Sequence, residues 1–278
     1  MTTENKNSLL FIWAELRHRS TVALRCFSSL SNVKVFFEPC FYVAVSGNKN
    51  DRNFDGYLEE GIVKEVPNST FQKVKEEIEL ANEVSNVVVK DFASALSGKY
   101  DWIPENAVHV LLARHPASFM DSVAKLHIED KKGQNSVVKA FKDLLKEDKL
   151  CEALYNLYTF LQNNNRHVSI IDSNDLAENS LTVAKFICDF AKLPFSPDML
   201  SWNSLPRGVL PKNWIVPENF YRMDEIFHPC DVASTSTGFQ CTPDSKVYDL
   251  KRYNEIEKSI IEAQLPFYNK LIKNKHVF

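Results

Sequence analysis

The hydrophobic and polar positions near the start of the chain predict a strand, a tight turn and a helix. Residues 9–14 are six consecutive apolar residues, which suits a buried strand and is too short to span a membrane. Apolar side chains then recur at helical spacing over residues 22–30. Between them lies the polar turn 15–21, which contains two arginines and two hydroxyl side chains. In a parallel sheet this turn would lie at the carboxyl end of the strand, where ligands usually bind.

The same alternation of strand and helix patterns continues along the chain. We predict further strands at residues 33–37, 84–89, 107–113 and 167–171, and helices at 70–82, 117–126, 131–164 in pieces, 181–191 and 259–272, the last interrupted by Pro266. Strands alternating with helices, without a hairpin signal, favour an α/β fold with a doubly wound, mainly parallel five-stranded sheet and helices on both faces. We expect a single domain over residues 1–278.

Two stretches depart from this alternation. Residues 46–68 are polar and show no strand or helix period, so we interpret them as a mobile loop or lid. We expect this loop to belong to an insertion over residues 46–83 on the acceptor side of the ligand site. Residues 201–278 are loop-rich and contain spaced prolines.

Composition and charge narrow the class of protein. The chain has 278 residues, 44% of them hydrophobic, and we expect its 19 phenylalanines to lie mostly in the core. The formal net charge is −3 without a basic tract, which gives no support for a nucleic-acid partner. The six cysteines form no C-x-x-C pair, and no signal peptide, membrane span, H-E-x-x-H motif or Cys/His cluster is found. We therefore expect a cytoplasmic protein with free thiols and no metal.

The turn after the first strand is a candidate anion site. The first amides of a helix carry the positive end of its dipole, and two arginines and two hydroxyls stand beside them, which suits a phosphate or a sulfate. The alternative is a solvated loop in which Ser20 or Thr21 is only an N-cap. The glycines and lysine of a G-x-x-x-x-G-K-[ST] loop are missing, which argues against an ordinary ATPase or GTPase.

Polar residues also follow the other strands. Glu38 comes directly after the second strand and could be a ribose ligand, a general base or a surface carboxylate. Asp91 follows the third strand and could be a base, or the ion-pair partner of Lys90 or of an arginine in the anion turn. Arg114 follows the fourth strand and precedes a helix, so a second cationic turn is predicted in mid-chain.

Several short motifs occur in an order that is typical of one enzyme family. Residues 13–21 read WAELRHRST, like W-A-x-P-R-S-x-S-T; residues 35–39 read VFFEP, like V-F-x-E-P; residues 88–92 read VVKDF, like V-K-D-M. Arg114-His115-Pro116, with Ser122 eight residues after the arginine, is similar to an R-x-P pattern followed by a serine. Matches continue at residues 170–176, 193–195, 199–202 and 236–239. The chain resembles the sulfotransferases that use 3′-phosphoadenosine 5′-phosphosulfate (PAPS) and release 3′-phosphoadenosine 5′-phosphate (PAP).

The resemblance implies a P-loop-like sulfotransferase fold and roles for specific residues. Two separate anion sites would hold the two ends of PAPS, and Arg17 would stabilise charge as the sulfuryl group leaves. Glu38, which we prefer slightly, or Asp91 would be the base. By similarity, the residues that bind the cosubstrate are Arg17, His18, Arg19, Ser20 and Thr21 at the 5′-phosphosulfate, Arg114 and Ser122 at the 3′-phosphate, and Ser236, Thr237, Gly238 and Phe239 elsewhere on the nucleotide.

The sequence also departs from the family pattern in its anion turn. Glu15-Leu16 replaces the usual proline-containing pair, which would place an acid beside the anion, and Arg19 replaces a small residue. These changes leave open a catalytically weak or inactive PAP-binding interaction protein on the same fold. For an active enzyme we expect a small-molecule acceptor with a hydroxyl or amine. The 46–68 loop and the many phenylalanines favour an apolar alcohol such as a lipid, steroid or polyketide.

Overall fold

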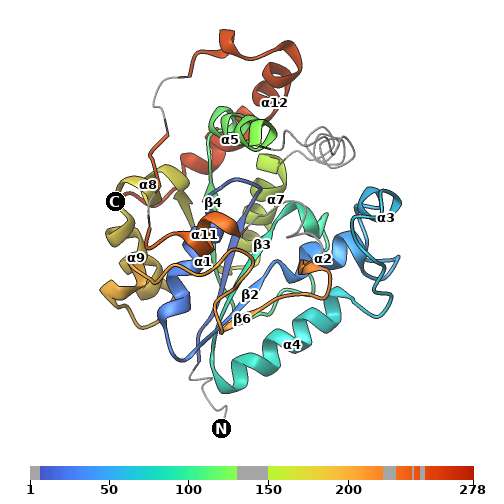
Figure 1. Cartoon of the computed structure of the whole chain (residues 1–278), viewed down its shortest axis with the longest axis vertical. Coiled ribbons are helices and arrows are strands. Elements are labelled where there is room, and N and C mark those ends of the chain that lie inside the picture. The colour runs from blue at the N-terminus through green and yellow to red at the C-terminus, as the bar shows by residue number, and fades with distance from the viewer. Residues whose placement is uncertain (1–6, 130–149, 222–229, 240, 245–247) are drawn as a thin grey trace.

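A computed structural model of the chain describes residues 7–129, 150–221, 230–239, 241–244 and 248–278 (Figure 1). Part of the predicted helical stretch 131–164 lies outside these residues. The remainder of that stretch forms one helix, α7 (Leu150–Asn163). In the described part of the chain, no helix is both long enough and apolar enough to cross a lipid bilayer.

The described sheet has six parallel strands in the order β5-β4-β1-β3-β2-β6. The strands are β1 (Leu9–Ala14), β2 (Val33–Phe37), β3 (Asn86–Phe92), β4 (Val108–Ala113), β5 (His167–Asp172) and β6 (Trp214–Ile215). The predicted doubly wound parallel sheet is confirmed, with one strand more than the five expected. The additional strand β6 has two residues, paired with Val35 and Phe36, and is too short to show a hydrophobic period.

Helices cover both faces of the sheet (Figure 1). Besides α7, these are α1 (Ser20–Cys26), α2 (Pro39–Ser46), α3 (Gly56–Glu59), α4 (Phe71–Val84), α5 (Pro116–Glu129), α8 (Ser173–Glu178), α9 (Ser180–Ala191), α11 (Asp231–Thr235), α12 (Glu255–Ile272), and the short 3₁₀ helices η1 (Phe27–Ser29), η2 (Ser94–Leu96), η3 (Pro197–Leu200) and η4 (Leu250–Arg252). On one face of the sheet, α1 packs with α11 and η3, and α9 also packs on η3. On the other face, α2 packs with α4, and α7 packs with α12.

The predicted break of the last helix at Pro266 is wrong. Helix α12 runs from Glu255 to Ile272 with Pro266 inside it. It also begins earlier than expected, because Asn254 and Glu257 form a reciprocal capping box. Packing against α7 and α5 offsets the hydrogen bond that the proline removes.

The core is built around β1, whose residues Leu10, Phe11, Ile12 and Trp13 are fully buried. The central strands have both faces covered, which explains their continuous apolar runs. Many phenylalanines lie in this core as expected, namely Phe11, Phe27, Phe36, Phe37, Phe41, Phe71, Phe92 and Phe220. The six cysteines are free thiols.

The stretch 46–68 contains more regular structure than its sequence indicates. It includes α3, and Tyr57, Ile62 and Val63 are buried. Tyr57 packs edge-on against Phe41 of α2 at 5.9 Å between ring centroids. The expectation that this stretch lacks a regular element is therefore wrong, and its action as a lid stays a prediction.

Candidate functional site

The carboxyl ends of the strands place a row of polar residues along one edge of the sheet. In strand order the row contains Asp172 at β5, Arg114 at β4, the turn 15–19 at β1, Asp91 at β3 and Glu38 at β2. Neighbouring strands lie about 4.8 Å apart, so three strand spacings, or about 14 Å, separate the ends of β4 and β2. Cationic side chains at one part of this edge and the carboxylate of Glu38 at another are therefore separated by a distance of this order.

Three residues of this edge have left-handed backbone conformations. Arg17 has φ 65°, Arg19 has φ 62° and Glu38 has φ 51°. For side chains of this kind the left-handed region costs about 1–2 kcal/mol per residue. Strained residues concentrated at one place are typical of functional sites, because the surrounding structure must hold them there. The strain supports the assignment of this edge as the site.

Three arginines gather in what we call the arginine cluster (Arg17, Arg19 and Arg114). Arg17 Nε donates to Ser122 Oγ of α5 at 2.9 Å. Arg114 Nη1 donates to the backbone carbonyl of Arg17. These contacts join the two turns for which the sequence predicts anion sites, because β1 and β4 are neighbours in the sheet.

Asp244 lies between two of these arginines. Its carboxylate accepts from Arg114 Nε at 2.9 Å and Nη2 at 2.6 Å, and from Arg19 Nη1 at 3.1 Å and Nη2 at 2.8 Å. Burial alone would raise the pKa of Asp244, but the hydrogen bonds and charge of Arg114 and the nearby Arg19 hold it below its usual value. Asp244 was missed by sequence reasoning, because no local pattern marks a contact with residues more than a hundred positions away.

The side chain of His18 faces the interior. The residue is 2% exposed, its Nδ1 lies 2.8 Å from the carbonyl oxygen of Leu112, and its own carbonyl accepts from Ser173 Oγ. Burial lowers the pKa of His18 to about 3, so the ring is neutral at physiological pH. These contacts of His18 with Leu112 and Ser173 hold the turn 15–19 on the interior side.

Two details of the turn differ from expectation. The N-cap of α1 is Arg19 and no side chain caps the helix, so the interpretation of Ser20 or Thr21 as N-cap is wrong. The carboxylate of Glu15 accepts from the backbone N–H and the hydroxyl of Ser94 at 2.9 and 2.7 Å. Glu15 is fully buried and anchors the turn to η2, so its negative charge is engaged there.

Asp91 caps helix α2. Its carboxylate accepts from the backbone N–H groups of Cys40 at 2.6 Å, Phe41 at 3.0 Å and Phe92 at 2.9 Å. The residue is fully buried, and burial raises its pKa to about 7. The alternative ion pair between Asp91 and Lys90 is wrong, because Lys90 pairs with a different carboxylate.

Glu38 and Lys90 form a buried ion pair. Lys90 Nζ contacts Glu38 Oε1, and the exposed fractions of the two residues are 1% for Lys90 and 6% for Glu38. Burial raises the pKa of Glu38, while the charge of Lys90 opposes the rise. The interpretation of Glu38 as a surface carboxylate is therefore wrong. Lys90 was not proposed as a site residue, although a lysine inside the apolar run VVVKDF was the signal.

Glu38 retains one oxygen for further interactions. Its Oε2 accepts no hydrogen bond from any residue that the structure describes. The Lys90 ammonium lies against the rings of Phe92 and Phe37, at 3.7 and 5.2 Å from their centroids. The pair is therefore held in an apolar environment.

The predicted nucleotide-binding residues 236–239 pack against residues 200–202. Ser236 Oγ accepts from Trp202 Nε1 at 3.2 Å, and Phe239 N donates to the Leu200 carbonyl at 3.0 Å. Gly238 cannot carry a side chain, since a Cβ would lie 2.7 Å from the Leu200 oxygen. Their hydrogen bonds within the described residues are not with the arginine cluster. The following segment reaches it instead, through Asp244 and through the Thr242 carbonyl, which accepts from Arg19.

No protein-family model matches the chain, and no curated protein matches it. Among solved structures, the sulfotransferase domain of the Synechococcus PCC 7002 olefin synthase aligns with 94% of this chain and 96% of its own length, at 12% identity and a TM-score of 0.51. The chain has the sulfotransferase fold. The resemblance drawn from the motifs is thereby confirmed at the level of the fold.

Two further solved structures with this fold are less similar by TM-score. The sulfotransferase domain from the curacin biosynthetic pathway is 17% identical, with coverage of 94% of this chain and 98% of that one and a TM-score of 0.49. Retinol dehydratase in complex with retinol and PAP is 11% identical, with coverage of 97% and 82% and a TM-score of 0.42.

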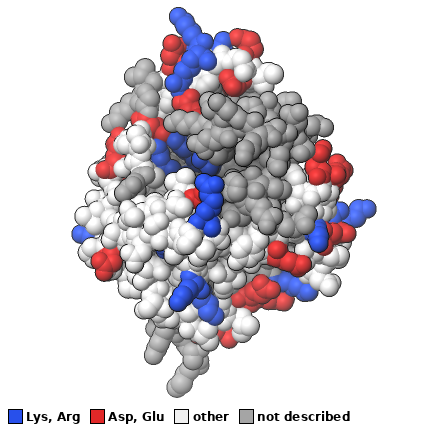
Figure 2. Space-filling model, in the orientation of Figure 1, with Lys and Arg blue, Asp and Glu red and all other residues white. Residues whose placement is uncertain are grey.

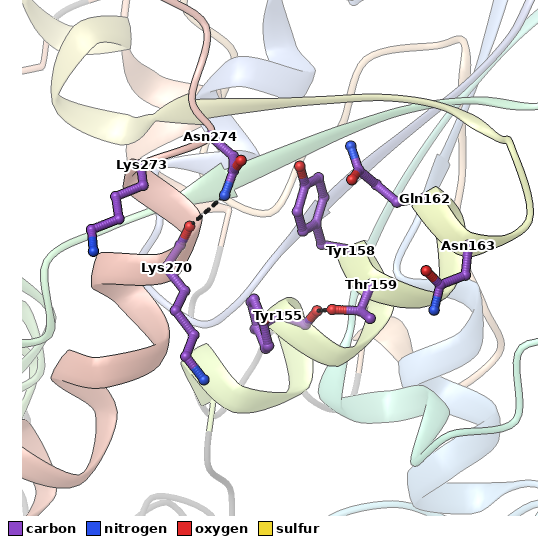
Figure 3. Close-up of a pocket in the computed structure, with 8 residues that line it drawn as sticks. All are labelled: Tyr155, Tyr158, Thr159, Gln162, Asn163, Lys270, Lys273 and Asn274. Carbon is purple, nitrogen blue, oxygen red and sulfur yellow. Dashed lines mark hydrogen bonds between the residues drawn. The ribbon is translucent and has the colours of Figure 1, made fainter.

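A separate hollow lies between α7 and α12 of the sulfotransferase fold (Figure 3). It has a volume of about 340 Å³ and is lined by Tyr155, Tyr158, Thr159, Gln162, Asn163, Lys270, Lys273 and Asn274. It contains no carboxylate that could act as a base. Figure 2 shows basic side chains near the middle of the visible face. Within the described residues no group of three or more His, Cys, Asp or Glu side chains could hold a metal ion.

Proposed function

We propose that the protein is a PAPS-dependent sulfotransferase that moves a sulfuryl group to a hydroxyl or amine of a small-molecule acceptor. The observation that carries the proposal is the arginine cluster at the carboxyl edge of the sheet, with the buried carboxylate of Glu38 two strands away. When bound, PAPS supplies an activated sulfuryl group. The three guanidinium groups and the Ser122 hydroxyl are donors that fit its phosphate and sulfate oxygens.

Different residues of the cluster would hold the two ends of the nucleotide. Arg114 and Ser122 would bind the 3′-phosphate. Arg17, Ser20 and Thr21 would bind the 5′-phosphosulfate, and Arg17 would stabilise the charge that develops on the leaving oxygen. Arg17 donates to Ser122, and the Arg17 carbonyl accepts from Arg114. A phosphate bound at Arg114 and Ser122 would therefore help to orient Arg17 for the 5′-phosphosulfate.

Glu38 would be the general base in this proposal. Its unengaged Oε2 can accept the acceptor's proton, and burial raises its pKa towards the working pH, which suits proton transfer. Lys90 orients the carboxylate through Oε1. Asp91 already accepts three backbone N–H groups and is the weaker candidate.

An apolar alcohol is the acceptor class that these surroundings favour. The rings of Phe37 and Phe92 lie next to the Lys90 ammonium of the Lys90–Glu38 pair. The ring of Phe41 lies next to that of Phe92, with 5.1 Å between the ring centroids. The stretch 46–68 packs on the same group through Tyr57. The free thiols support the expectation of a cytoplasmic location.

The test is turnover of PAPS to PAP by the full chain with a panel of apolar alcohols, amines and polar sugars. Sulfated product that depends on Glu38 supports the proposal, and turnover of polar sugars alone would contradict the acceptor class. The second candidate is a PAP-binding protein without catalysis, which the engagement of Arg19 and Arg114 by Asp244 favours. It predicts PAP binding without turnover of any acceptor.

A further inference from the structure

The carboxylate of Asp244 occupies the arginine groups that an external anion would need. It accepts four hydrogen bonds, two from Arg114 and two from Arg19, with distances of 2.6 to 3.1 Å. Both arginines contact it in the two-pronged arrangement with which guanidinium groups hold carboxylates and phosphates alike. A phosphate bound to Arg114 would therefore compete with Asp244 for the same N–H groups.

The two arginines have little further hydrogen-bonding capacity for a ligand. Arg114 uses Nε and Nη2 for Asp244 and Nη1 for the Arg17 carbonyl. Arg19 bonds, besides Asp244, to the carbonyls of Ser173 and Thr242. The side chains of Arg19, Arg114 and Asp244 have exposed fractions of only 8%, 10% and 12%. In this low-dielectric setting one internal negative charge already offsets part of the positive charge of the cluster.

The backbone at Asp244 is fixed separately from its carboxylate. Its N–H donates to Asn174 Oδ1 at 2.6 Å, and the N–H of Asn174 donates to Asp172 at the end of β5. The chain can thus stay attached at Asn174 when the carboxylate leaves the arginines. The carboxylate is therefore a replaceable ligand of the cluster.

We propose that Asp244 is an internal competitor of the nucleotide's 3′-phosphate and so sets the affinity and selectivity of the site for the nucleotide. This inference rests on the proposed function and concerns the same site. Binding of a nucleotide with a 3′-phosphate requires Asp244 to leave Arg114. Binding of a nucleotide that lacks this phosphate does not.

The test compares Asp244→Asn with the wild-type chain by titration calorimetry, using PAP and adenosine 5′-monophosphate as probes. We expect Asp244→Asn to bind PAP about tenfold or more tightly than wild type, because the variant removes a charged competitor. The affinity for adenosine 5′-monophosphate should change less than about twofold, since this probe has no 3′-phosphate. The matched control is Asp249→Asn, which removes an aspartate that caps η4 and should leave both affinities unchanged.

The outcomes separate this inference from the proposed function. If Asp244→Asn binds PAP more tightly than wild type and Asp249→Asn does not, the inference is supported, whether or not wild type binds PAP detectably. Wild type that binds PAP as tightly as, or more tightly than, a folded Asp244→Asn would overturn the inference and leave the proposed function standing. Absence of PAP binding by both proteins would overturn both. Thermal unfolding of each variant confirms that it is folded.

Discussion

Arg17 Nε donates a hydrogen bond of 2.9 Å to Ser122 Oγ, and this contact joins the turn after β1 to helix α5. The two residues come from the two anion sites that the sequence predicts separately. In the proposed function, the two ends of the nucleotide would therefore be bound by one connected set of donors. Binding and catalysis should therefore respond differently to substitution of each partner.

Arg17→Ala and Ser122→Ala should separate catalysis from binding. We expect Arg17→Ala to lower kcat by about 100-fold or more, because it removes a charge that stabilises the transition state. Ser122→Ala should weaken PAPS binding by about tenfold and change kcat little, because one hydrogen bond to bound phosphate is lost. Steady-state kinetics of both variants measure this split. Arg207→Ala is the control, since Arg207 is a largely exposed arginine paired with Asp231; equal effects of Arg17→Ala and Arg207→Ala would contradict the role of Arg17.

Glu38→Gln should slow sulfuryl transfer strongly while leaving nucleotide binding intact. We expect kcat to fall by about 100-fold or more with PAP affinity unchanged, because the amide cannot take a proton. Asp91→Asn should instead act mainly on stability, since it weakens the cap of α2, a change worth about 1 kcal/mol. Kinetics and urea unfolding of both variants distinguish the roles. A fully active Glu38→Gln protein would rule out Glu38 as the base.

The ion pair of Glu38 and Lys90 leads to a prediction on pH dependence. Burial raises the pKa of Glu38, and the charge of Lys90 limits the rise. A base acts when deprotonated, so kcat should increase with pH through that raised pKa. Lys90→Met removes the opposing charge and should move the rising limb to higher pH. The pH profiles of kcat for wild type and Lys90→Met test this; an unshifted limb would mean that another group titrates.

Buried neutral histidines should limit stability in acid. The folded-state pKa of His18 is lowered to about 3 by burial, whereas in the unfolded chain it lies near 6.5. Between pH 6.5 and pH 3 the unfolded state then binds more protons than the folded state. The contribution of neutral His18 to the free energy of unfolding is therefore fully present above pH 6.5 and is lost as the pH falls towards 3. One such group makes unfolding about 2 kcal/mol easier at pH 5 than at pH 7. Urea unfolding of wild type and His18→Asn at both pH values measures it, and an equal pH dependence in both would contradict the role of His18.

The sheet and the polar residues at its carboxyl edge could be predicted because buried parallel strands give long apolar runs that polar turns interrupt. The end of β3 was misplaced, since Lys90 and Asp91 look like the polar residues that follow a strand. Lys90 stays in the strand because Glu38 neutralises it, and Asp91 stays because it caps α2. Both reasons depend on a residue about fifty positions away, so the local pattern cannot contain them.

Asp244 is a stronger example of the same limit. It lies in a segment without hydrophobic periodicity, and its partners Arg19 and Arg114 are 225 and 130 residues away along the chain. The sequence identified the arginines because each occupies a turn after a strand. Only the three-dimensional structure places a carboxylate between them.

The most direct test of the central claim is thermal unfolding of the full chain with and without PAP, beside Arg114→Ala and the surface control Arg207→Ala. A ligand at 100 times its dissociation constant stabilises a protein by about 2.7 kcal/mol. We predict a rise in Tm of several degrees with PAP for wild type and Arg207→Ala, a larger rise for Asp244→Asn at equal PAP concentration, and none for Arg114→Ala. If neither folded wild type nor folded Asp244→Asn responded to PAP, the arginine cluster would not be a PAPS site.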